Sequence, residues 1–153
     1  MISAAAVSHT QTGMEGRMKV DGTCHCGEIA FEAELDPDRV GICHCADCQT
    51  ISASAFRTVA AVPGETFKIL KGAPREYIKV GDSGNRRVQA FCPNCGSGLY
   101  ATNADGERDL YNLRVGTLSQ RDQLVPQMEY WRQSALPWVP ALENTTKFDA
   151  NPG

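Results

Sequence analysis

Seven cysteines in a chain of 153 residues limit what it can fold into more than any other feature. Three fall within six residues in the spacing C-x-C-x-x-C, and four stand in two pairs on either side. In chain order they are Cys24 and Cys26, then Cys43, Cys45 and Cys48, then Cys92 and Cys95. Four thiolates complete a tetrahedral zinc shell, whereas three leave one position open for water or substrate. The spacing therefore predicts a structural zinc held by the outer pairs, and a second zinc, with one position open for substrate, held by the central triple.

Other uses of these thiols stay open at this point. Cys24 and Cys26 could instead share a metal with two of the central three cysteines. The central triple could also be a second structural site, closed by a fourth ligand among His25, His44 and Asp47. Further hypotheses are buried free thiols, a redox-active C-x-x-C pair, and Cys–His nucleophilic catalysis. The redox hypothesis lacks a surrounding βαβ pattern, and the nucleophilic one needs a cysteine that zinc would occupy.

The residues around each outer pair suit a shared metal. In a regular strand the two residues of a C-x-C pair lie about 6–7 Å apart. Two sulfurs on one zinc must come within about 4 Å of each other. The first pair therefore has to bend, which the flanking Gly22 and Gly27 permit, and Gly96 has the same role after the second pair.

Length and composition indicate one ordinary globular domain. The hydrophobic fraction is 42% and the charged fraction 22%, and no apolar run approaches the ~20 residues of a membrane span. We expect a flexible tail over residues 1–17 and a single zinc-binding β domain over residues 18–148. The apolar residues 1–7 lack a basic start and a clear cleavage site, so no signal peptide is expected.

The charge and the odd cysteine count bear on partners and location. A net charge of −3 without clustered Lys and Arg predicts that the protein does not bind nucleic acid. Without secretion, an odd number of cysteines favours metal over disulfides. We therefore expect a cytoplasmic protein that binds no membrane.

Short β-rich segments with frequent turn signals predict an all-β fold. The clearest strand, residues 29–35, alternates so that Ile29, Phe31, Ala33 and Leu35 face inward. One or two helical turns are expected over residues 49–55. Further strands are expected over residues 56–62, 67–70, 75–80, 86–91, 99–101 and 110–115.

Two tryptophans near the C-terminal end have two interpretations. Trp131 and Trp138 could both belong to the hydrophobic core, or they could form an aromatic wall above the open zinc position.

Taken together, these motifs resemble the family of glutathione-dependent formaldehyde-activating enzymes, which includes centromere protein V. The resemblance covers residues 19–140 in the family's order. The matching stretches are Gly22 to Gly27, Cys43 to Cys48, Phe91 to Leu99, Arg114 to Leu118 and Trp131 to Trp138. It implies a β-tent fold of several short coiled antiparallel sheets around zinc sites, shared with B-type peptide-methionine sulfoxide reductases.

The resemblance also implies a chemistry for the two zinc sites. A structural zinc would lie on Cys24, Cys26, Cys92 and Cys95, and a catalytic zinc on Cys43, Cys45 and Cys48. The implied activity is a carbon–sulfur lyase that adds a thiol such as glutathione to formaldehyde or another small aldehyde. The alternative is a non-catalytic zinc module that binds a thiol ligand or a protein partner.

Two departures from the family pattern lie near the C-terminal end. Glu129 stands where many members have histidine, and Ala135 stands where many have lysine. Losing that lysine removes a cation that would attract an anionic tripeptide such as glutathione.

Overall fold

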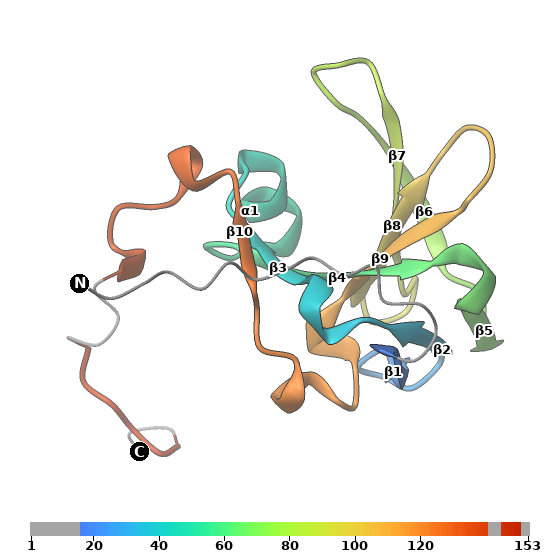
Figure 1. The fold of residues 1–153 in the computed structure, drawn as a ribbon, viewed down its shortest axis with the longest axis horizontal. Coiled ribbons are helices and arrows are strands. Elements are labelled where there is room, and N and C mark those ends of the chain that lie inside the picture. The colour runs from blue at the N-terminus through green and yellow to red at the C-terminus, as the bar shows by residue number, and fades with distance from the viewer. Residues whose placement is uncertain (1–15, 141–144, 151–153) are drawn as a thin grey trace.

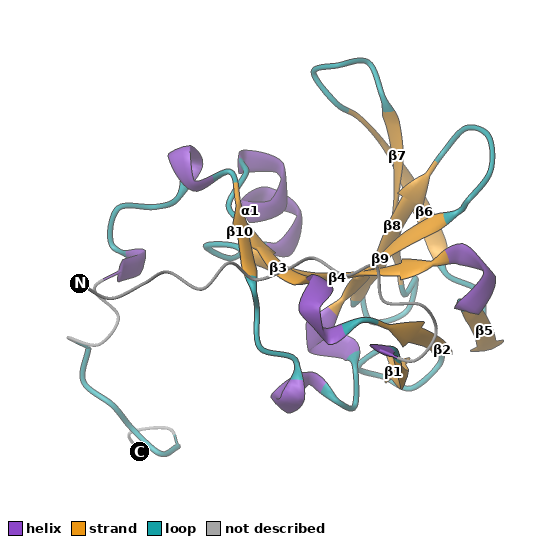
Figure 2. Ribbon diagram, in the orientation of Figure 1, coloured by secondary structure: helices purple, strands orange, loops and turns teal. Residues whose placement is uncertain are grey.

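Ten short strands and one short α-helix form the framework of the described residues (Figures 1 and 2). The computed structural model describes residues 16–140 and 145–150, so residues 1–15 of the expected tail lie outside the described part. The expected all-β class is confirmed. The strands are β1 (Met18–Thr23), β2 (Ala30–Leu35), β3 (Val40–Cys43), β4 (Arg57–Pro63), β5 (Lys68–Lys71), β6 (Arg75–Val80), β7 (Arg86–Phe91), β8 (Gly98–Asn103), β9 (Leu110–Arg114) and β10 (Met128–Tyr130), and the helix is α1 (Ala46–Ser52).

The strands form two sheets of unequal size. One has three strands in the order β1-β2-β5, and the other has seven in the order β10-β3-β4-β9-β8-β7-β6. Every pairing is antiparallel except that of β10 with β3, which is parallel. This exception differs from the expected set of antiparallel sheets. It arises because β10 returns from the far end of the chain and adds to the outer edge of β3.

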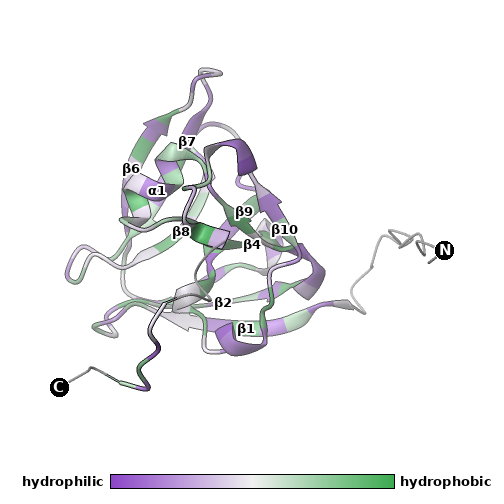
Figure 3. Cartoon of the chain, turned by 90° about the vertical axis from the view of Figure 1, so that its left-hand side faces the viewer, coloured by the Kyte–Doolittle hydropathy of each residue, from purple (hydrophilic) through white to green (hydrophobic). Residues whose placement is uncertain are grey.

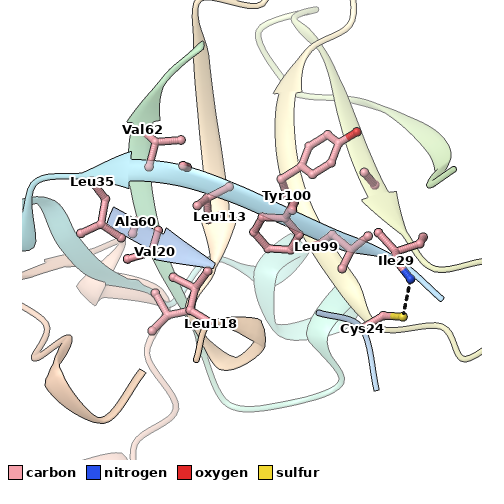
Figure 4. Close-up of a cluster of buried hydrophobic side chains, with 14 of the residues drawn as sticks. Val20, Cys24, Ile29, Leu35, Ala60, Val62, Leu99, Tyr100, Leu113 and Leu118 are labelled. Carbon is pink, nitrogen blue, oxygen red and sulfur yellow. Dashed lines mark hydrogen bonds between the residues drawn. The ribbon is translucent and has the colours of Figure 1, made fainter. Parts of the chain in front are cut away.

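The core lies between the two sheets. All four residues predicted to face inward are buried: Phe31, Ala33 and Leu35 of β2, and Ile29 just before it. They meet buried side chains of the larger sheet, including Val62 and Leu113 (Figure 4). In Figure 3 the hydrophobic colour is strongest on the central strands near β4 and β8, and the hydrophilic colour lies on strands, short helices and turns around them. None of the helices among the described residues is long and apolar enough to span a membrane.

The interpretation of the tryptophans as core residues is wrong. The exposed fraction is 58% for Trp131 and 52% for Trp138. Both follow β10, an edge strand with a single neighbour, so no second layer from the described residues covers them. Trp131 also has a φ of 59°, in the left-handed region, where the chain turns away from the sheet.

The helix begins earlier than expected. It starts at Ala46 instead of near residue 49, and it therefore includes Cys48. The cause is an unusual N-cap, in which the Cys45 sulfur accepts a hydrogen bond from the peptide N–H of Cys48 at 3.3 Å. Serine and aspartate commonly cap helices in this way, and here a thiol takes their place.

Candidate metal centres

Four cysteines from two distant loops meet at one point. Cys24 and Cys26 lie in the loop after β1, and Cys92 and Cys95 lie in the loop after β7. Their sulfurs all fall within 4.8 Å of one another. The Cys24–Cys26 sulfurs are 3.5 Å apart and the Cys26–Cys92 sulfurs 3.7 Å apart. Tetrahedral zinc with ~2.3 Å bonds separates its sulfur ligands by about 3.8 Å, so this donor set fits zinc.

Two of the three glycines expected to bend the chain beside these cysteines have a positive φ, whereas Gly22 lies within β1 and does not. Gly27 and Gly96 follow the two pairs with φ of 79° and 78°, values that disfavour residues with a side chain. The peptide N–H of Ile29 donates to the Cys24 sulfur at 3.2 Å (Figure 4). The Ser97 hydroxyl accepts from the peptide N–H of His25 at 3.0 Å, which ties the two loops together.

Ser97 also acts directly on one sulfur of this group. Its hydroxyl lies 3.3 Å from the Cys95 sulfur. This hydrogen bond is the main cause that lowers the pKa of the Cys95 thiol to about 5. A thiol of that pKa is a thiolate at neutral pH, the form that binds metal.

The three central cysteines form the second group. Cys43 ends β3, Cys45 caps α1, and Cys48 lies in the first turn of α1. Their sulfurs also lie within 4.8 Å of one another. Burial raises the pKa of the Cys43 thiol to about 12, so without a metal this sulfur keeps its proton at neutral pH. Three converging thiols suit a soft cation that displaces their protons, so this donor set also fits zinc.

None of the three candidates for a fourth ligand joins the second group within the described residues. The His44 Nε2 atom lies 2.9 Å from the Glu129 carboxylate, and His44 is fully buried. Asp47 forms an ion pair with Lys79, and His25 is exposed beside the other group. The seven cysteines thus gather as four plus three and form no disulfide.

Residues from the C-terminal region hold the central loop in place. The peptide N–H of His44 donates to the Tyr130 carbonyl of β10 at 3.0 Å. The Gln49 amide donates to the carbonyls of His44 and Ser134, at 2.8 and 3.0 Å. Glu129, where many family members have histidine, thus has a definite role as the partner of His44.

Two arginines stand beside the second group. Arg57, opposite Cys43 in the β3–β4 register, donates from Nη2 to the Cys48 sulfur at 3.0 Å. Arg114, at the end of β9, is only 9% exposed and donates to the Gln89 side-chain oxygen at 2.7 Å. Burial, with Arg57 as the next cause, lowers the pKa of Arg114 to about 9, so the guanidinium stays charged at neutral pH.

Sequence reasoning missed Arg57, Gln89 and the His44–Glu129 pair. Arg114 was noted only as part of a matching motif. These residues come from strands far apart in the chain, and the strand order that brings them together is not visible locally. The one local signal was Arg57 at the start of a β-rich segment nine residues after Cys48.

Comparison with known proteins agrees with this geometry. The model of the family described as glutathione-dependent formaldehyde-activating enzyme matches residues 19–134. The chain belongs to this family. The match includes all seven cysteines and extends from β1 to the turn after β10.

Two further comparisons match individual proteins. A Schizosaccharomyces pombe protein described as an uncharacterized lyase is 26% identical over 93 residues, which are 60% of this chain. The chain spans 63% of the length of that relative. A crystal structure of a Rhodobacter sphaeroides protein aligns with a TM-score of 0.55 at 21% identity. That alignment covers 71% of this chain and 98% of the bacterial chain, and it supports the fold alone.

Proposed function

We propose that the protein is a zinc-dependent carbon–sulfur lyase that adds a thiol to formaldehyde or another small aldehyde. The observation that carries this proposal is the group of three cysteines without a fourth protein donor among the described residues. A metal held by three ligands keeps a position for an exogenous group, as catalytic zinc sites do. The family match and the lyase name of the fungal relative support the same class of chemistry.

Two zinc ions per chain would have different roles. Cys24, Cys26, Cys92 and Cys95 would hold one as a structural site with all four ligands supplied by protein. Cys43, Cys45 and Cys48 would hold the other. There zinc would supply Lewis-acid polarisation of an aldehyde oxygen or stabilisation of a substrate thiolate.

Neighbouring residues moderate the charge of the central sulfurs. Arg57 donates to Cys48, and the peptide N–H of Cys48 donates to Cys45. Both hydrogen bonds draw negative charge away from a thiolate. His44 and Glu129 keep the loop between Cys43 and Cys45 from rotating, because the imidazole is buried and held on one side.

The reaction balances without an oxidant or reductant. The substrate sulfur forms a bond to the carbonyl carbon, and the carbonyl π electrons move to oxygen. The proton that the thiol loses is matched by the proton that this oxygen gains. The product is a hemithioacetal, which for formaldehyde is an S-hydroxymethyl thioether.

The rate of adduct formation tests this proposal. The reaction also runs in water without help, so exchange between free thiol and adduct should be measured by NMR with and without zinc-loaded protein. We expect the protein to accelerate exchange, and Cys45→Ser to abolish the gain while the circular dichroism spectrum stays unchanged. Elemental analysis should find two zinc ions in the parent protein and one in the variant.

Two results would contradict the proposed function. No acceleration across several thiols and aldehydes, with two zinc ions bound, would leave the alternative of a non-catalytic zinc module. Fewer than two zinc ions per chain would contradict the division of the cysteines into two sites.

A further inference from the structure

Arg57 and Arg114 share one neutral acceptor. The Gln89 Oε1 atom accepts from Arg114 Nη2 at 2.7 Å and from Arg57 Nη1 at 3.4 Å. Within the described residues, the only other acceptor of Arg57 is the Cys48 sulfur, and that of Arg114 is the Asn112 carbonyl at 3.5 Å. Two guanidinium groups thus converge on a single amide oxygen.

The positive charge of this pair is incompletely balanced. Neither arginine forms an ion pair with a carboxylate among the described residues. The Arg57 Nε atom is buried and has no hydrogen-bond partner in the described part of the chain. If three thiolates bind Zn²⁺, that group carries a net charge of −1, which offsets one arginine and leaves the other. Buried charges without a partner are costly, so a site like this favours an anion from outside.

There is room for such an anion beside the pair. Two adjoining cavities of about 340 and 450 Å³ are both lined by Arg57 and Arg114. They also share Ile51, Gly96 and Gly98, which leave an opening without acidic side chains.

We propose that Arg57 and Arg114 bind the carboxylate of a small acidic thiol whose sulfur reaches the central cysteine group. This deepens the proposed function and rests on it. Arg57 contacts the Cys48 sulfur at 3.0 Å, so a carboxylate bound to Arg57 would lie close to the central cysteine group. A ligand could then reach that group with a sulfur only a few bonds from its carboxylate. A short mercapto acid meets that spacing. In glutathione the carboxylates are separated from the sulfur by peptide units, and the lysine that would attract them is replaced by Ala135.

Calorimetry on the zinc-loaded protein tests this inference through binding alone. The probes are 3-mercaptopropionate, the uncharged 3-mercapto-1-propanol, and propionate, which has the carboxylate without the thiol. We expect the acid to bind at least about tenfold more tightly than the alcohol, as charge-assisted hydrogen bonds imply. Propionate should compete with the acid for the same site.

Variants of the pair locate the binding site. Arg57→Gln should reduce the preference for the acid to within about twofold, and Arg57→Lys should keep part of it. Gln89→Glu changes no volume and places a carboxylate between the arginines, so it should also remove the preference. Arg86→Gln, which takes one cation from the same strand as Gln89 but outside both cavities, is the matched control and should behave like the parent.

The outcomes separate this inference from the proposed function. Equal binding of acid and alcohol by the parent protein, or a preference that survives in both Arg57→Gln and Gln89→Glu, would overturn it. Acid-specific binding without any catalysis would support the carboxylate site and contradict the proposed lyase activity. Catalysis with equal binding of the acid and the alcohol would support the lyase activity and contradict the carboxylate site.

Discussion

Individual side chains distinguish the two cysteine groups. The sulfurs of the four-cysteine group receive hydrogen bonds from their own loops, as Cys24 does from Ile29 and Cys95 from Ser97. The central group has one such bond, from the Cys48 peptide N–H to Cys45, and it also depends on side chains from other strands, namely Arg57 and, through His44, Glu129. When side chains from several strands surround a cysteine group, single substitutions can change the charge of its sulfurs. Such an arrangement suits a reactive site.

Removing the carboxylate that holds His44 should loosen the central group. The Nδ1 atom of His44 already lacks a partner, so Glu129→Ala would leave the whole buried ring unpaired within the described structure. We expect a loss of about 1–3 kcal/mol in the free energy of unfolding, measured by urea titration of the zinc-loaded protein. Glu129→Gln keeps an acceptor oxygen and should cost less.

The control for this prediction is Glu107→Ala, which truncates an exposed glutamate in the β8–β9 loop. Equal stability of the Glu129→Ala and Glu107→Ala variants would mean that His44 needs no partner.

The three clusters of cysteines were predictable from sequence because ligand spacing is a local property, whereas the sequence alone left open which clusters share a metal. A C-x-x-C turn followed by glycine has the same shape wherever it occurs, and Gly96 has the expected positive φ. Arg57 and Gln89 were not predictable. They meet only because β4 and β7 take their places in a seven-stranded order that the local sequence does not encode.

Among the secondary-structure elements, seven of the ten strands were predicted, and β1, β3 and β10 were missed. β2 has enough residues to display its period of two, and its buried side chains are those expected. β3 and β10 have four and three residues, too few for a pattern. The parallel pairing of these two strands joins segments far apart in the sequence, so the residues next to each strand do not predict it.

The close approach of β1 to β2 should be sensitive to a single methyl group. A Cβ at Gly22 would overlap the ring of Phe31, which is fully buried and cannot move aside. Gly22→Ala should therefore cost about 1–3 kcal/mol in the free energy of unfolding, measured by urea titration. Gly116→Ala meets no atom within 4 Å and serves as the control. A Gly22→Ala variant as stable as this control would show that β1 is packed more loosely.

An ion pair between β6 and the loop after β8 gives a prediction for pH dependence. Arg108 donates to both oxygens of Glu76, at 2.6 and 2.9 Å, and this hydrogen bonding lowers the pKa of Glu76. The pair therefore stabilises the fold above the unfolded-state pKa of about 4.3 and loses its effect as the pH falls through the lower folded-state value. Glu76→Gln should cost up to about 1 kcal/mol at pH 7, because both side chains are partly exposed.

Chemical denaturation at several pH values checks this expectation. The difference between parent and Glu76→Gln should shrink as the pH falls below about 4. Glu32→Gln, on an exposed face of β2, should show no such trend. A difference that stays constant with pH would rule out the ion pair as its source.

In the molecule as a whole, the four-cysteine group connects the two sheets. Cys24 and Cys26 follow β1 of the smaller sheet, and Cys92 and Cys95 follow β7 of the larger one. The two pairs are 66 residues apart, measured from Cys26 to Cys92. A metal here would close a long loop that the backbone alone leaves open, whereas the central group lies within one sheet and its adjoining helix.

Loss of metal from the two groups should therefore have unequal consequences. A structural zinc contributes on the order of 10 kcal/mol to folding, so Cys92→Ser, at a fully buried position, should abolish cooperative thermal unfolding. Cys45→Ser removes one sulfur from the partly exposed central group and should leave a folded protein with one zinc. Circular dichroism with elemental analysis of the same samples distinguishes the two variants. If Cys92→Ser melted at the same temperature as Cys45→Ser, the sheets would be held together by the core alone, and the distinction between a structural and a working metal would lose its basis.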